Sequence, residues 1–154
     1  LSKKNTGEII NYFNIELDEY DLDSLYSISN GSVGNLIDVV DSAGIEVFRL
    51  TNDIFSDPIS LKTQVLEELL LLVGRDQTGK AFQTVHILLS HWLAEKAKKE
   101  AAGSVIYNFR RDQWVSLWRE MNHLFRQTEN VNLDKKQTIF TTFMKISSLC
   151  RAYS

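Results

Sequence analysis

The strongest constraint on the fold is a stripe of apolar side chains within residues 111–129, which read RDQWVSLWREMNHLFRQTE. Apolar residues recur there at intervals of three, four and seven, the period of one face of an α-helix. The members of this stripe are Trp114, Leu117, Trp118, Met121, Leu124 and Phe125. The pattern predicts an amphipathic helix that buries one face against other helices.

Four further segments carry the same kind of periodicity, at residues 45–55, 61–73, 79–101 and 132–150. In the last of them the predicted inner stripe is Ile139, Phe140, Phe143, Ile146 and Leu149. Apolar residues that alternate with polar ones, as in a half-buried strand, are not sustained anywhere in the chain. The 154 residues include one proline and seven glycines, so few positions interrupt the helical segments. We therefore predict an all-α protein with a bundle of about five helices.

The first part of the chain has shorter periodic segments than the rest. Residues 1–41 predict a small unit of short helices, and the stretch from Asp41 to Gly44 is the weakest joint between the two parts. We place the domain boundary there, with the larger helical domain at residues 42–154. The chain begins with Leu1 rather than Met, and we expect it to be a fragment whose N-terminal partner domain is missing.

Glycine, proline and small polar residues predict where the helices begin and end. We expect Pro58 in a first helical turn, Gly74 as a C-cap and Thr78 as the next N-cap. Residues 101–109, AAGSVIYNF, predict a loop. Asp134 is expected to cap the last helix.

Residues 74–81, GRDQTGKA, partly fit a phosphate-binding loop. Such a loop follows a strand and ends in Lys followed by Ser or Thr, whose hydroxyl holds a magnesium ion. Here Ala81 follows Lys80, and residues 61–73 continue a helical pattern. We therefore interpret the segment as a turn between two helices.

Composition argues against several classes of function. The net charge of −3 includes no basic excess of the kind that binds nucleic-acid phosphates. One cysteine, Cys150, and three histidines predict neither disulfides nor a zinc site. No arrangement of a nucleophile with a general base is visible, and no apolar run is long enough to span a membrane. We expect no catalytic residue, cofactor or metal, and a cytoplasmic location.

Two segments resemble a known family. Residues 28–48, ISNGSVGNLIDVVDSAGIEVF, resemble part of the second domain of bacterial clamp-loader subunits. Residues 112–143 resemble the C-terminal helices of the delta-prime subunits of DNA polymerase III, in which a tryptophan-containing helix leads into a motif that here reads NLDKKQ, residues 132–137. The order and spacing of both segments match this family along nearly the whole chain.

The resemblance implies a fold and a role. Residues 1–41 would be the helical lid domain, and residues 42–154 the helical collar domain that holds the subunits of a clamp loader together. The implied partners are the ATP-binding subunits of the gamma or tau type and the delta subunit. DNA would be contacted only indirectly or through the missing domain. The implied function is a non-catalytic scaffold in DNA replication.

One position bears on the type of subunit. ATP-binding clamp-loader subunits carry an arginine for the nucleotide's phosphates where this chain has Gly34, which implies a subunit that does not hydrolyse ATP. Gly31, Ser32 and Gly34 have two interpretations, turn and cap chemistry or direct contact with a ligand. Delta-prime relatives often have Arg and Ala next, where this chain has Asn35 and Leu36.

Six residues of the C-terminal segment are further candidates for subunit contacts: Trp114, Trp118, Phe125, Asn132, Asp134 and Gln137. Aromatic side chains are strong interface anchors, but those of a helical stripe also serve as core. For the three polar residues, helix capping is the other interpretation.

Two other functions remain open at this stage. The chain could be a fragment of an ATP-binding clamp-loader subunit, an NTPase, in which case residues 74–81 would matter. It could also be a helical adaptor unrelated to clamp loaders.

Overall fold

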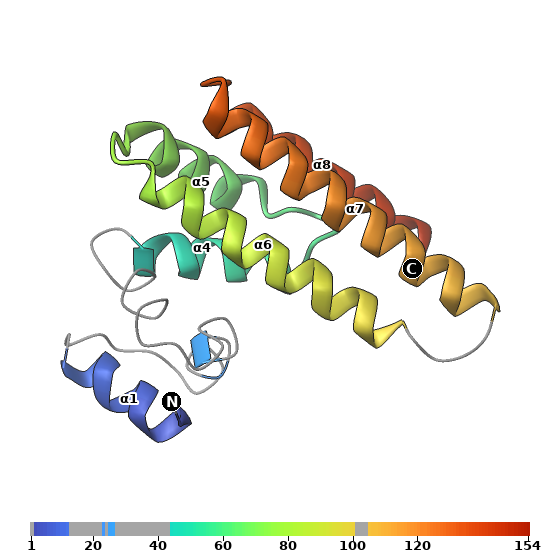
Figure 1. Cartoon of the computed structure of the whole chain (residues 1–154), viewed down its shortest axis with the longest axis horizontal. Helices are drawn as coiled ribbons and strands as arrows, with labels where there is room; N and C mark the ends of the chain where they lie inside the picture. Colours follow the sequence, from blue (N-terminus) through green and yellow to red (C-terminus); the bar gives the residue numbers. More distant parts are fainter. Residues whose placement is uncertain (1, 13–22, 24, 27–43, 101–104) are drawn as a thin grey trace.

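A computed structural model describes residues 2–12, 23, 25–26, 44–100 and 105–154 of the chain. The described residues contain no strand, so the all-α prediction is confirmed. The helices are α1 (Lys3–Tyr12), α4 (Gly44–Ser56), α5 (Thr63–Arg75), α6 (Lys80–Lys99), α7 (Val105–Asn130) and α8 (Lys135–Ala152) (Figure 1).

Helices α4 to α8 form a bundle (Figure 1). The contact between α6 and α7 is the most extensive one between two helices of the bundle. Helix α4 packs against both α5 and α6. Helix α8 returns beside α7 and also contacts α5. The described residues of 44–100 and 105–154 thus contain the expected number of helices, while the lid and collar assignments stay predictions.

Every helix of the bundle contributes a large side chain to the same core. Phe48, Leu69, Phe82, Phe125 and Phe143 come from α4, α5, α6, α7 and α8 in that order, and all are fully buried. Full burial of one such side chain contributes about 1.5–3 kcal/mol. The bundle is therefore held by the inner stripes that the sequence periodicity predicts.

We call the contact between α6 and α7 the α6–α7 seam. Its centre is a stack of rings, with Phe82 and Phe125 centroids 4.7 Å apart and the His86 ring 4.8 Å from Phe125. His86 Nε2 lies 2.6 Å from Asn122 Oδ1, and the Asn122 amide donates to the carbonyl oxygen of Trp118 at 2.9 Å. His86 and Asn122 are thereby hydrogen-bonded as the rings pack.

Two predicted helix boundaries next to α5 are wrong. Pro58 lies in the connection between α4 and α5 rather than in a first helical turn, because α5 begins only at Thr63. Gly74 is inside α5, since the Asp76 N–H donates to the Leu72 carbonyl oxygen and extends the helix to Arg75.

The start of α6 and the start of α7 also differ from the prediction. Gly79, with φ of 77°, rather than Thr78, precedes the first residue of α6. Helix α7 begins at Val105, so residues 105–109 are helical and not a loop. Residues 101–104 lie outside the described part. The Arg110 guanidinium lies 4.7 Å from the Tyr153 ring centroid, a tertiary contact that anchors this first part of α7.

Candidate interaction surface

The turn between α5 and α6 has the geometry of a helix connection. Helix α5 continues to Arg75, where a phosphate-binding loop would require a strand. The carboxylate of Asp76 accepts hydrogen bonds from the N–H groups of Thr78, at 3.0 Å, and Ala81, at 2.7 Å. An anionic side chain therefore already occupies the N-terminus of α6, the position that a phosphate group would need.

The ionisation of Asp76 fits this arrangement. Burial raises the pKa of the carboxyl, but hydrogen bonds from Ala81 and Thr78 and the positive charge of Lys135 outweigh it. The pKa of Asp76 therefore lies below its ordinary value, and the carboxylate stays charged at neutral pH.

The three aromatic candidates on α7 lie in two environments. Trp114 and Phe125 are buried in the core and present no surface to a partner. Trp118 is 36% exposed, and its indole N–H donates to Ser90 Oγ on α6 at 2.9 Å. Trp114 and Phe125 thus belong to the core, whereas both interpretations of Trp118 stay predictions.

The three polar candidates lie at the junction of α7 and α8. Asn132 has a left-handed backbone, with φ of 53°, between the two helices. Asp134 caps α8, as predicted, because its carboxylate accepts from the N–H groups of Lys136, at 2.9 Å, and Gln137, at 3.2 Å. The Gln137 amide donates along the helix to Thr141 Oγ1 at 3.2 Å.

The remaining candidates, Gly31, Ser32 and Gly34, lie outside the described residues, as do Asn35 and Leu36. Their two interpretations are therefore unchanged.

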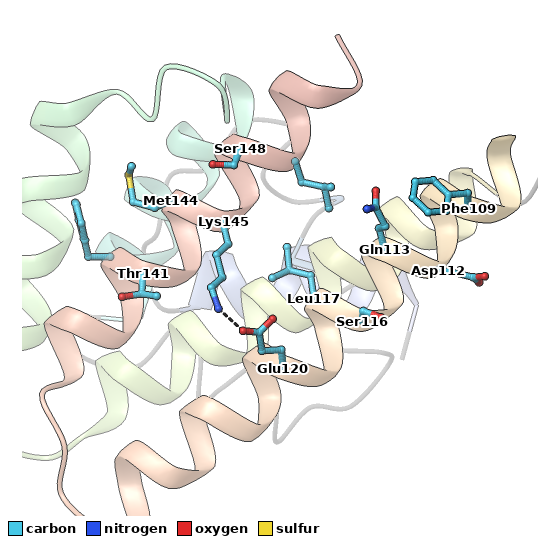
Figure 2. A pocket seen from close by; sticks show the side chains of 12 residues that line it. Phe109, Asp112, Gln113, Ser116, Leu117, Glu120, Thr141, Met144, Lys145 and Ser148 are labelled. Atoms are coloured by element: carbon cyan, nitrogen blue, oxygen red, sulfur yellow. Dashed lines mark hydrogen bonds and ion pairs between the residues drawn. The ribbon is translucent and has the colours of Figure 1, made fainter.

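A groove of about 920 Å³ lies between α7 and α8. Leu117 of α7 and Leu149 of α8 lie in it, and Phe109, Phe140 and Met144 contribute exposed apolar surface. Figure 2 shows Leu117 between the two helices and Met144 on α8 above it. The groove is open along its length and bears apolar side chains on both walls.

A second hollow, of about 470 Å³, continues this surface between α5 and α8. Phe140 lines both hollows, and Leu71 of α5 adds apolar surface at the far side. We call the surface formed by Leu71, Phe109, Phe140, Met144 and the two hollows the outer face. The exposed fractions are 52% for Leu71, 61% for Phe109, 42% for Phe140 and 43% for Met144.

Charged side chains border the outer face. Lys145 of α8 forms an ion pair with Glu120 of α7 across the groove (Figure 2). In all, four carboxylates and two lysines line the two hollows, so the charge of the border is net negative. The members of this border are Glu67, Asp112, Glu120, Asp134, Lys136 and Lys145. The outer face thus combines apolar surface with an acidic rim, as protein-binding surfaces often do.

Sequence reasoning placed Phe140 in the buried stripe of the last helix and did not single out Met144. The structure corrects the first assignment, because α8 packs its Ile139, Phe143 and Ile146 inward and leaves Phe140 and Met144 outside. The sequence shows only that these five apolar residues cover a wider arc of α8 than one packing contact needs, and not which of them stay exposed.

Other features of the described residues indicate no chemical site. They contain no cluster of three or more His, Cys, Asp or Glu side chains arranged to hold a metal ion. Burial raises the pKa of the half-buried Cys150 thiol more than the charge of Lys96 lowers it, which disfavours a reactive thiolate. No helix among them has both the length and the apolar character that crossing a bilayer requires.

Comparison of the chain with known protein families, characterised proteins and solved structures found no match.

Proposed function

We propose that this chain is the scaffold portion of a clamp-loader subunit of the delta-prime type. In this role it contributes no catalytic residue of its own, and its bundle holds neighbouring subunits of the complex that loads the sliding clamp during DNA replication. The partners would be the ATP-binding gamma or tau subunits and the delta subunit, in the cytoplasm. The proposal combines the family resemblance of residues 28–48 and 112–143 with the properties of the bundle.

The observation that carries the proposal is the outer face. A helical domain gains nothing in its own stability from leaving Phe109, Leu71, Phe140 and Met144 exposed to water. Contiguous apolar surface with a polar border is typical of protein–protein contacts. A bundle that uses one side for its own core and the other for neighbours is what a collar domain requires.

The helix N-terminus at α6 favours the non-hydrolysing type of subunit over an ATP-binding one. The Asp76 carboxylate accepts hydrogen bonds from the N–H groups of Thr78 and Ala81, and its negative charge would repel a phosphate group. Nucleotide titration of the chain tests this point, and micromolar ATP binding would favour the ATP-binding subunit instead.

Co-purification with the ATP-binding clamp-loader subunit of the same organism tests the scaffold role. We expect the unaltered chain to co-elute with that subunit in size-exclusion chromatography. Met144→Glu places a charge in the outer face and should abolish the complex. Ile87→Glu is the matched control, because Ile87 is an equally exposed apolar residue, at 42%, on α6. It should leave the complex intact.

Two outcomes would count against the proposal. The first is that the unaltered chain forms no complex with any clamp-loader subunit, as an unrelated helical adaptor would behave. The second is that Met144→Glu assembles as well as Ile87→Glu, which would mean that the outer face does not bind the neighbour.

A further inference from the structure

The dimensions of the outer face match those of a helix. Along α8 it runs from Lys136 to Leu149, which corresponds to about 20 Å at 1.5 Å per residue. The groove between α7 and α8 covers the part from Phe140 to Leu149, and the hollow between α5 and α8 covers the part from Lys136 to Phe140. The α7–α8 part is shown in Figure 2. Both parts are open to solvent, and together they form the outer face. A partner helix of about 13 residues, nearly four turns, would cover it from end to end.

The walls of the groove favour a helix over an extended strand. Both walls are helices whose backbone N–H and C=O groups are bonded within the helix, so no strand edge is offered for main-chain pairing. Recognition must therefore use side chains. The exposed side chains Phe140 and Met144 are four residues apart, one turn of α8, and would lie between the successive turns of a packed helix.

The charges at the border indicate the polarity of the partner. Glu120 is already paired with Lys145 across the groove. Asp134 accepts hydrogen bonds from two backbone N–H groups at the start of α8. Glu67 has no ion-pair partner among the described residues, and Asp112 has only its chain neighbour Arg111, at 3.5 Å. Glu67 lines the hollow beside α5, and Asp112 lines the groove near Phe109, so they mark opposite ends of the outer face.

From this geometry we propose that the outer face binds one amphipathic α-helix of a partner protein, with an apolar stripe along the groove and Lys or Arg residues at both ends. The inference deepens the proposed scaffold role, on which it rests, by naming the kind of segment through which a neighbouring subunit attaches. The apolar stripe covers Phe109, Phe140 and Met144, and the basic residues meet Asp112 and Glu67.

Selection from a displayed library of random 16-residue peptides tests the chemistry of the occupant without assuming its identity. The bait is the full chain, and the Met144→Glu chain serves for counter-selection. We expect enriched peptides to carry apolar residues at helical spacing and an excess of Lys and Arg near their ends. Their affinity should fall at least tenfold with Met144→Glu and stay within twofold with Ile87→Glu.

A charge exchange then tests the acidic ends. The double variant Glu67→Lys and Asp112→Lys should weaken binding of a selected basic peptide at least tenfold at low salt. It should strengthen binding of the same peptide with its end lysines replaced by glutamate. Equal binding of both peptides to both chains would overturn the assignment of the ends, and enrichment of peptides without helical spacing, or no enrichment, would overturn the helix.

Self-association is the remaining outcome. If sedimentation shows that the chain alone forms a dimer that Met144→Glu dissociates, the occupant is a second copy and the proposal fails. Peptide binding together with no complex with clamp-loader subunits would retain the helix site and reject the scaffold role. A complex with clamp-loader subunits together with no peptide binding would retain the scaffold role and reject the helix.

Discussion

The two sides of α7 differ in what their side chains do. On the α6–α7 seam, Phe125 is buried within a stack of rings, and Asn122 bridges His86 and the backbone of its own helix. On the outer face, Phe109 of the same helix is 61% exposed and the polar residues line an open groove. The comparison shows that one amphipathic helix can provide core on one side and an apolar surface for a partner on the other.

The largest expected contrast is between two phenylalanines of α7. Phe125→Ala should lower the free energy of unfolding by about 3–5 kcal/mol, because it removes a fully buried ring from the seam. Phe109→Ala should change it by less than about 0.5 kcal/mol, because the ring is mostly in water. Urea unfolding followed by circular dichroism measures both. Equal losses would show that the outer face is part of the core.

A smaller contrast concerns two amides of α7. Asn122→Ala removes the partner of His86 and should cost about 1–3 kcal/mol, because the half-buried ring loses its hydrogen bond. Gln113→Ala, in the groove, is the matched change and should cost less than about 0.5 kcal/mol. Thermal or urea unfolding separates the two. The division between the sides of α7 would be contradicted if Gln113→Ala cost as much as Asn122→Ala.

One change beside the outer face should nevertheless reduce stability. Asp134→Ala removes the cap of α8 and should cost about 1 kcal/mol, because the N–H groups of Lys136 and Gln137 lose their acceptor. Asp134→Asn, which keeps an acceptor oxygen, should retain most of that stability. If Asp134→Ala had no effect in urea unfolding, the cap would contribute nothing to stability. The difference in stability between the seam and the outer face would then depend on apolar burial alone.

The smallest expected effect is the pH dependence at the α5–α6 turn. The pKa of Asp76 is lower in the folded chain than the ordinary value of 3.8, so its stabilising contribution is complete above that pH and is lost as the pH falls through the folded pKa. Asp76→Asn removes this titration. The stability of the variant should therefore fall less steeply than that of the unaltered chain below about pH 4.

Urea unfolding at a series of acidic pH values measures this difference. Asp112→Asn is a suitable control, since it changes an exposed carboxylate of the outer face. If the free energy of unfolding fell equally steeply with decreasing pH for Asp76→Asn and the unaltered chain, the carboxylate at the start of α6 would not stabilise the fold.

Much of the fold could be predicted from the sequence, whereas the outer face could not. The stripes of residues 45–55, 61–73 and 111–129 correspond to α4, α5 and α7, because helical periodicity is a local property of the chain. The boundaries at Pro58 and Gly74 were misplaced, because tertiary packing decides how far a helix continues past a weak stop signal. Phe140 was assigned to the core, since periodicity alone does not say which part of a wide apolar arc is covered.

The sequence by itself determined the helical class, the cap at Asp134 and the lack of a strand pattern before Gly74, because these depend on neighbouring residues. Only the tertiary structure decided that Trp114 and Phe125 are buried while Met144 is exposed. The physical reason is that a side chain leaves water only where another helix covers it, and the chain's local pattern does not contain the position of that helix.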